Sequence, residues 1–380
     1  MTKKQVAKIL IFILIVLWLL VHVTYCIRTN GDVKDRFVGF YSEKDNTIDA
    51  VIIGSSPVYP CIAGPMIYGD MGITLYPLAS NMQRPVATKY LVEEALKTQS
   101  PDLFIFEMRM WTAEDENLLG NMAHTREVTD NMKYSLNRIK TINAMVEDPS
   151  ERLSYYFDIF KYHSNWKTLA LWEQLRTFTY EYPDDYKGFV PFSTVGPAPK
   201  TNNAAITERE AIPAEQEEYL TDLLAYLKEK NLNALFVITP YDVQEDEQKK
   251  INYISDMVTA AGYNFLDMDQ YVDEIGLDYD VDFKDYGTHT NIVGAYKVTR
   301  FFEEYLKENY VDKGTFGLAD SMSKNMESGK SSNYNDHRGD SKYKSWDDAY
   351  NLWLEAYEKG SEEVFYNAEN GIYYDLEEGE

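Results

Sequence analysis

Residues 50–60, Ala-Val-Ile-Ile-Gly-Ser-Ser-Pro-Val-Tyr-Pro, join a short apolar run to a glycine and two serines. The run Ala50–Ile53 is β-branched and too brief for a helix, so it predicts a buried strand. Gly54 permits a tight turn at the end of that strand, where parallel α/β sheets place their functional sites. Ser55 or Ser56 would then lie at a strand-to-helix turn, near backbone N–H groups that can stabilise an oxyanion. The alternative is that the two serines only cap the following helix.

The first 28 residues predict a membrane anchor. Three lysines within the first eight residues precede a mostly apolar run from Ile9 to Ile27. As a helix this run would span about 28 Å, close to the thickness of the hydrocarbon core of a bilayer. The lysines predict a cytoplasmic N-terminus and an outward-facing domain. A cleaved signal peptide is the alternative, but no small-x-small cleavage site follows the run, so a single-pass anchor is favoured.

Charge and cysteine content narrow the class of protein. The 380 residues include 37 basic and 62 acidic side chains, and this net charge of −25 argues against nucleic-acid binding. The two cysteines, Cys26 and Cys61, do not suggest a disulfide framework. An outward-facing domain without disulfides fits the cell membrane of a Gram-positive bacterium better than a eukaryotic secretory route.

Apolar strand patterns alternate with helical patterns on both sides of the serine turn. We expect further strands at Ile73–Leu78, Leu103–Glu107, Ala234–Ile238 and Tyr263–Leu266. We expect helices between Pro57 and Tyr68, and at Val86–Lys97, Ile251–Ala261 and Thr290–Tyr310. This alternation predicts an α/β domain over residues 47–310, with a central parallel sheet covered on both faces. Residues 29–46 are expected to be a polar connector between the anchor and this domain.

Two segments depart from the alternation. Residues 111–215 are rich in Tyr and Trp, and we interpret them as a mostly helical insertion that caps the site; a packing extension without function is the alternative. Residues 311–380 form an acidic extension whose part 314–345 predicts disorder. The aromatic residues between Trp346 and Tyr357 recur at spacings of three and four, which predicts one amphipathic docking helix.

Residues 282–295, Asp-Phe-Lys-Asp-Tyr-Gly-Thr-His-Thr-Asn-Ile-Val-Gly-Ala, bring an acid, a base and an amide into one loop. A serine nucleophile needs a base to take its proton, and imidazole titrates near neutrality. His289 would be that base, and a carboxylate on its other ring nitrogen would fix its orientation. Either Asp285 or Asp282 could supply the carboxylate. The alternative is that His289 and Asn291 only cap the next helix.

The acidic run before this loop raises the question of a metal. Asp278, Asp280 and Asp282 alternate as in a calcium loop, but an EF-hand would need Gly and Glu where the chain has Phe283 and His289. We therefore expect no metal site and no cofactor.

Together the two stretches resemble the SGNH/GDSL hydrolase superfamily, over roughly residues 47–110 and 213–308. Gly54-Ser55-Ser56 is similar to that family's Gly-Asp-Ser block, and the loop that contains Asp285 and His289 is similar to its Asp-x-x-His block. The resemblance implies a three-layer α/β/α fold in which Ser56 is the nucleophile, His289 the base and Asp285 the orienting acid. An anchor with an outward domain is similar to the branch of the D-alanyl-lipoteichoic acid protein and the alginate O-acetylation proteins. Those proteins act on acyl groups of cell-envelope polymers, often beside a membrane-bound O-acyltransferase.

The chain departs from the family pattern at the His–Asp spacing and at the oxyanion donors. Asp285 lies four residues before His289 rather than three. The glycine of the second block has no clear counterpart in the loop Ala79-Ser80-Asn81, and Glu107-Met108-Arg109 stands where an Asn is usual. Asn81, or Arg109 as a charged donor, would have to act beside the Ser56 amide. Losing one such donor costs about two to three orders of magnitude in rate.

Two functions of different classes follow. The first is a membrane-anchored serine esterase or O-acyltransferase that acts on acyl esters of a cell-envelope polysaccharide or a similar glycan. Whether water or a sugar hydroxyl accepts the acyl group is left open by the sequence. The second is a catalytically inactive scaffold of the same fold, which binds glycan or a membrane-bound O-acyltransferase through the insertion and the C-terminal helix.

Overall fold

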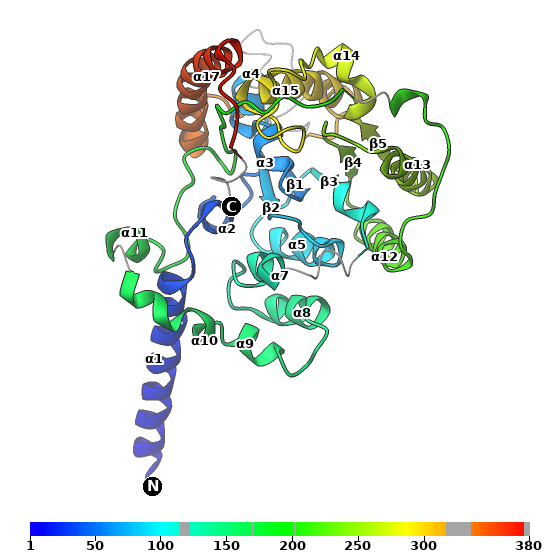
Figure 1. The fold of residues 1–380 in the computed structure, drawn as a ribbon. Coiled ribbons are helices and arrows are strands. Elements are labelled where there is room, and N and C mark those ends of the chain that lie inside the picture. The colour runs from blue at the N-terminus through cyan, green and yellow to red at the C-terminus, as the bar shows by residue number, and fades with distance from the viewer. Residues whose placement is uncertain (115–121, 169–170, 201–202, 317–335, 376–380) are drawn as a thin grey trace.

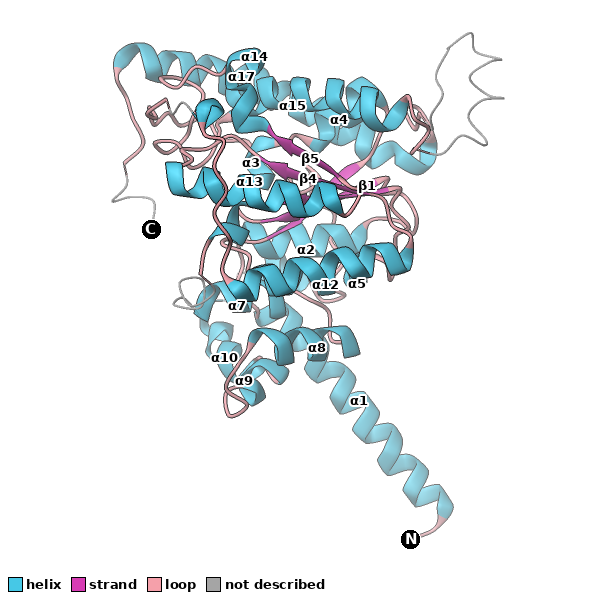
Figure 2. Ribbon diagram, turned by 90° about the vertical axis from the view of Figure 1, so that its right-hand side faces the viewer, coloured by secondary structure: helices cyan, strands magenta, loops and turns pink. Residues whose placement is uncertain are grey.

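Five parallel strands form the central sheet, in the order β2-β1-β3-β4-β5 (Figures 1 and 2). The computed structural model describes residues 1–114, 122–168, 171–200, 203–316 and 336–375. The strands are β1 Ala50–Gly54, β2 Leu75–Ala79, β3 Leu103–Glu107, β4 Ala234–Ile238 and β5 Asn264–Asp267. Every strand that the sequence predicted is present, with its ends shifted by at most two residues.

Successive residues of each strand enter two separate apolar cores, one on each side of the sheet. Val51 and Ile53 of β1 lie in the core that α5, α12 and α13 cover, whereas Ala50 and Ile52 lie in the core beneath α3, α4 and α15. Both faces are therefore buried, which is why the strands are continuous apolar runs. The prediction of an α/β domain with a parallel sheet covered on both faces is confirmed. The bounds of these helices are α3 Val58–Cys61, α4 Gly64–Met71, α5 Thr88–Ala95, α12 Ala214–Lys230, α13 Glu245–Ala260 and α15 Ile292–Leu306.

The single helix predicted after Pro57 is two helices in the structure, α3 and α4. Ile62 and Ala63 adopt extended backbone between them, and Pro65 stands in the first turn of α4, a position that suits its fixed φ. The other predicted helices differ mainly at their ends. The 3-10 helix η1 (Pro85–Ala87) precedes α5, and α15 continues into the π-helical segment η6 (Lys307–Val311). Short helices η2 (Arg109–Thr112), η5 (Met268–Tyr271) and α14 (Val272–Ile275) follow strands β3 and β5.

Residues 29–46 are not the polar connector that the sequence suggested. They contain the helix α2 (Asp32–Ser42), whose Phe37 and Phe40 are fully buried in the core beside β2. The buried Arg36 donates a hydrogen bond from Nη1 to the carbonyl oxygen of Ala79 at 2.9 Å. This amphipathic helix resembles a linker in composition because it is rich in charged residues. Some of those charged side chains are buried inside the protein, so the helix belongs to the core.

The N-terminal helix α1 (Lys3–Ile27) projects from the domain (Figure 1). It is the one helix in the described part of the chain that is long and apolar enough to cross a membrane, a test that a signal sequence also passes. The C-terminal end of α1, which we call its outer end, is packed into the domain: Tyr25, Cys26 and Ile27 are buried. The next residue, Arg28, forms a fully buried ion pair with Asp158, with 2.7 Å between Nε and Oδ2. The last turns of α1 are therefore part of the folded domain.

The insertion is helical in its first half and extended in its second. Its helices are α7 Met122–Thr129, α8 Leu136–Met145, α9 Arg152–Tyr156, α10 Ile159–Tyr162, η3 His163–Thr168 and α11 Leu171–Leu175, followed by η4 Asn203–Ala205. These first helices lie at the end of the domain from which α1 projects, as both ribbon views show (Figures 1 and 2). The insertion also reaches the candidate site: α7 supplies Glu127, and in the extended half the Gly196 carbonyl accepts the backbone N–H of Tyr286 at 3.0 Å. Helices α10, η3 and α11 contact α1 instead.

The C-terminal helix α17 (Lys344–Asn370) packs on α4 and α15, and it is far longer than the aromatic pattern. Trp346 is buried, and the Tyr68 hydroxyl donates to Asp347 Oδ1 at 2.8 Å. Of the stretch expected to be disordered, residues 317–335 lie outside the described residues. The part that follows them is folded: the 3-10 helix η7 (Ser341–Tyr343) stacks a tyrosine ring on His337.

Candidate active site

The structure brings Ser56, His289 and Asp285 into one hydrogen-bonded line. His289 Nε2 lies 2.8 Å from Ser56 Oγ, and His289 Nδ1 lies 2.6 Å from Asp285 Oδ2. Ser56 is the second residue after β1, and the other two residues belong to the loop before α15. Burial alone would raise the pKa of Asp285, but its hydrogen bonds and charge interaction with His289 hold that pKa below its usual value. An ionised carboxylate can only accept, so Nδ1 carries the proton and Nε2 accepts from the Ser56 hydroxyl.

The loop geometry explains how an acid four residues before the histidine reaches its ring. Phe283 and Thr290 form an antiparallel bridge, and the backbone N–H of Lys284 donates to the His289 carbonyl at 2.8 Å. Between these residues the chain reverses at Tyr286 and Gly287, with φ of 60° and 108°. A Cβ on Gly287 would lie 2.9 Å from Asp242 Cβ, so this position requires glycine.

The alternative orienting acid, Asp282, lies outside this line. It is fully buried, where it accepts the Asp278 N–H at 2.7 Å and pairs with Lys297 at 2.6 Å. Asn291 also lies outside this line and has a structural role. Its Oδ1 accepts the backbone N–H groups of Val293 and Gly294 and so caps α15. The cap expected for this position is present, while His289 faces the serine instead.

Ser55 is held by a buried carboxylate that the sequence did not single out. Glu107 Oε2 lies 2.9 Å from Ser55 Oγ and 3.3 Å from Ser55 N, and both atoms donate to it. Glu107 Oε1 accepts the backbone N–H of Arg109 at 2.7 Å. Burial raises the pKa of Glu107 despite these hydrogen bonds. Its position at the end of β3, next to β1 in the sheet, was the signal available in the sequence.

The backbone N–H of Ser56 has no hydrogen-bond partner among the described residues, so it is available to an incoming oxygen. Asn81 is differently placed. Gly54, the last residue of β1, pairs with Ala79, the last residue of β2. Asn81 therefore lies two residues after the end of its strand, as Ser56 does. However, Asn81 donates from its backbone N to Glu127 Oε2 at 2.9 Å and from Nδ2 to Glu127 Oε1 at 3.1 Å. Both candidate oxyanion donors of Asn81 are thus bound to one carboxylate from α7.

Arg109 lies beside the histidine loop. Its Nη1 donates to the Thr288 carbonyl at 3.4 Å, and its guanidinium stacks over the Tyr241 ring, 4.1 Å from the centroid. It therefore contacts the residue before His289, and its positive charge faces the edge of the sheet that carries the three aligned residues.

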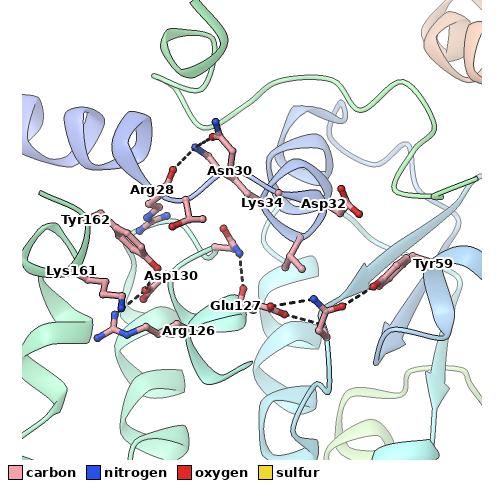
Figure 3. Close-up of a pocket in the computed structure, with 15 residues that line it drawn as sticks. Arg28, Asn30, Asp32, Lys34, Tyr59, Arg126, Glu127, Asp130, Lys161 and Tyr162 are labelled. Atoms are coloured by element: carbon pink, nitrogen blue, oxygen red, sulfur yellow. Dashed lines mark hydrogen bonds and ion pairs between the residues drawn. The ribbon is translucent and has the colours of Figure 1, made fainter. Parts of the chain in front are cut away.

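A pocket of about 690 Å³ lies between Asn81, in the loop after β2, and Arg28, at the C-terminal end of α1. Ser56, His289 and Asp285 are not among the residues that line it. Figure 3 shows Tyr59 at one end of the pocket and Arg28 and Tyr162 at the other, with Lys34 and Glu127 between them. Tyr59 also donates from its hydroxyl to Asn81 Oδ1 at 2.7 Å. The lining is dominated by polar and charged side chains, which suits a hydroxylated or charged ligand better than a bare hydrocarbon chain.

In the described residues no group of three or more His, Cys, Asp or Glu side chains is arranged to hold a metal ion. The two cysteines are buried and unpaired. A scan against protein-family models found no match for this chain, and a search of curated proteins found no similar sequence.

Proposed function

We propose that this protein is a serine esterase or O-acyltransferase of the SGNH type, acting on acyl esters of a cell-envelope glycan. The observation that carries the proposal is the line from Asp285 through His289 to Ser56, with distances of 2.6 and 2.8 Å. Serine, histidine and aspartate in this order are the groups that acyl transfer through a covalent intermediate requires.

In the proposed reaction Ser56 Oγ attacks the carbonyl carbon of the ester while His289 Nε2 takes the hydroxyl proton. The Asp285 carboxylate stabilises the imidazolium that forms. Collapse of the tetrahedral intermediate breaks the ester C–O bond, and His289 returns the proton to the leaving alcohol oxygen. Water or a sugar hydroxyl then attacks the acyl-serine, again with His289 as base, and either releases the acid or forms a new ester.

The proposed oxyanion site uses the Ser56 N–H, with Asn81 or Arg109 as further donors. For Asn81 to serve, the ester oxygen must replace the Glu127 carboxylate on its two N–H donors. The negative charge of Glu127 would otherwise lie close to the developing oxyanion and oppose it.

A membrane location fits this chemistry. The burial of the C-terminal end of α1 supports an uncleaved anchor, because removing α1 would take Tyr25, Cys26 and Ile27 out of the folded domain. The polar pocket that begins at Arg28 supports a hydroxylated carrier presented near the membrane surface. We propose a single-pass protein with an extracellular domain, from a Gram-positive bacterium, working beside a membrane-bound O-acyltransferase.

Hydrolysis of an aryl acetate and labelling by a fluorophosphonate probe test the proposal on the full chain in detergent. We expect turnover and labelling in the wild type, with Ser56→Ala and His289→Ala each lowering kcat by about four orders of magnitude or more. Ser55→Ala is the matched control, since its hydroxyl contacts Glu107 rather than His289. Labelling that persists in Ser56→Ala would contradict the assignment of the nucleophile.

A second candidate function is an inactive scaffold that binds glycan or a membrane-bound O-acyltransferase. The observation in its favour is that Glu127 takes both donors of Asn81. An inert wild type in both assays, combined with binding of soluble glycan to the pocket, would favour this candidate.

A further inference from the structure

The insertion contacts α1 at residues that come before the point where the chain enters the domain. The Phe178 ring lies 5.5 Å from the ring of Trp18 and stacks on His22 at 4.7 Å, centroid to centroid. Helices α10, η3 and α11 also contact α1. These contacts fix the height of the insertion along the membrane-spanning helix.

That height can be compared with the thickness of a bilayer. A helix rises about 1.5 Å per residue, so Trp18 lies about 22 Å from Lys3 along α1. The hydrocarbon core of a bilayer is about 30 Å thick, so a core that begins at Lys3 ends beyond Trp18, near Val23. A core that begins at Lys8 would end still closer to the domain. In either register Phe178 lies at or inside the outer boundary of the hydrocarbon.

Large apolar side chains are exposed on the same part of the insertion. Phe160 on α10 is 61% exposed, Trp166 on η3 is 64% exposed and Trp172 on α11 is 86% exposed. Apolar surface of this kind, gathered in one place, marks a contact with another apolar phase. We call the full set the collar, and it consists of Phe157, Phe160, Trp166, Trp172 and Leu175.

Basic side chains stand among the collar residues. Lys161 and Lys167 are both exposed. Tryptophan prefers the boundary between lipid and water, where its ring is apolar and its N–H stays hydrated, and lysine prefers the level of the lipid phosphates. The composition of the collar therefore matches the head-group region at which the position of α1 places it.

We propose that the collar is a second membrane contact, in which the aromatic side chains insert into the head-group region of the leaflet that α1 leaves. The occupant is the lipid bilayer itself, because helices α10, η3 and α11 contact α1, whose apolar side chains are exposed along the length that would cross the membrane. The domain would then be held to the membrane at the helix and at the collar, which fixes its tilt. This inference requires α1 in a membrane but is independent of the proposed chemistry.

Spin labels at engineered cysteines test the proposal on the full chain in phospholipid nanodiscs. Phe160→Cys and Trp172→Cys place labels in the collar. Phe365→Cys on α17 is the control, since Phe365 is also an exposed phenylalanine, at 49% exposure, and lies outside the collar. Both native cysteines are buried, so the label should react at the new positions. Oxygen concentrates in lipid and a nickel chelate stays in water, so the ratio of their collision rates reports the surroundings of each label.

We expect the oxygen-to-nickel ratio at positions 160 and 172 to be several-fold higher than at position 365. Equal ratios at all three positions would place the collar in water and overturn the proposal. Low collision with both reagents in the collar would mean that protein covers it, which also overturns the proposal. The two collar positions are independent, so one misfolded variant leaves the test intact. Adding Ser56→Ala should leave every ratio unchanged, which separates this result from the fate of the proposed function.

Discussion

Asp285 contacts His289 through both of its carboxylate oxygens: Oδ1 accepts the backbone N–H at 2.8 Å, and Oδ2 lies 2.6 Å from ring Nδ1. The first contact fixes the loop and the second fixes the ring. A spacing of four residues therefore places the acid correctly, because Tyr286 and Gly287 turn the chain back on itself.

Asp285→Asn should lower kcat by about four orders of magnitude, because an amide can donate to Nδ1 and so favours the wrong tautomer of His289. Initial rates with the aryl acetate measure this. Asp282→Asn is the matched control: it should reduce stability because it removes the carboxylate charge that pairs with Lys297, but it should leave kcat within a few-fold. An equal loss of kcat in both variants would show that Asp285 has no special role.

Glu107→Ala should lower kcat while leaving KM nearly unchanged, since Glu107 positions the serine turn without touching the ester. Its removal leaves two donors of Ser55 and one of Arg109 without an acceptor. Ser55→Ala removes only the hydroxyl contact and should lose much less activity. Rates for the two variants, beside their thermal unfolding, distinguish loss of positioning from loss of fold. A Glu107→Ala enzyme with wild-type kcat would exclude the positioning role.

Glu127→Gln should raise kcat/KM for the aryl acetate, because a neutral side chain competes less strongly for the donors of Asn81. Asn81→Ala should lower kcat by about two orders of magnitude if Asn81 donates to the oxyanion. Burial raises the pKa of Glu127, so wild-type Glu127 becomes neutral at a higher pH than an ordinary Glu. The ratio of Glu127→Gln to wild-type activity should therefore fall towards one as the pH is lowered. A ratio independent of pH would mean that Glu127 does not restrain the site.

Glu303 should make the protein less stable in alkaline solution. Burial raises the pKa of this carboxyl to about 8, with further contributions from Asp70. A group with a raised folded pKa favours folding below its unfolded pKa, and that stability is lost as the pH rises through the folded value. Glu303→Gln should increase the free energy of unfolding at pH 9 by roughly 1–3 kcal/mol and have little effect near pH 4. Denaturant titrations at the two pH values measure the difference, and an equal effect at both would refute it.

Arg28→Ala should destabilise the domain, because removing one partner of a buried ion pair costs about 3–5 kcal/mol. Arg138 Nη2, 3.5 Å from the same Asp158 oxygen, should offset part of that loss. The comparison is Arg209→Ala, which breaks an exposed pair with Asp256 and should cost less than about 1 kcal/mol. Melting temperatures in the same detergent rank the two variants. Similar small shifts in both would show that the outer end of α1 adds little to the fold.

The strands and the three aligned residues could be predicted because their signals are local. Ala50–Gly54 and Leu103–Glu107 are uninterrupted apolar runs, and the serine turn follows the first of them. His289 stands out because few histidines occur beside an aspartate, a glycine turn and a helix start.

The contacts that tune the site could not be predicted, because each joins residues far apart in the chain. Glu127 contacts Asn81 only when the insertion packs next to the end of β2, and no pattern in either segment predicts that contact. Residues 32–42 were misjudged for a different reason. Their charged side chains lower the mean hydropathy, yet Arg36 is buried and donates from Nε and Nη1 to the backbone carbonyls of Gly188 and Ala79.

The burial of Tyr25, Cys26 and Ile27 leaves no slack between the membrane helix and the α/β domain. A domain joined to its membrane helix by a flexible linker can bind partners at many distances from the membrane. With α1 in a bilayer, the domain would be held at one distance from the membrane, and under the proposed function Ser56 would then meet substrates at that distance. Inserting residues after Arg28 would let the domain move relative to α1, but it would also disrupt the buried contacts at this junction.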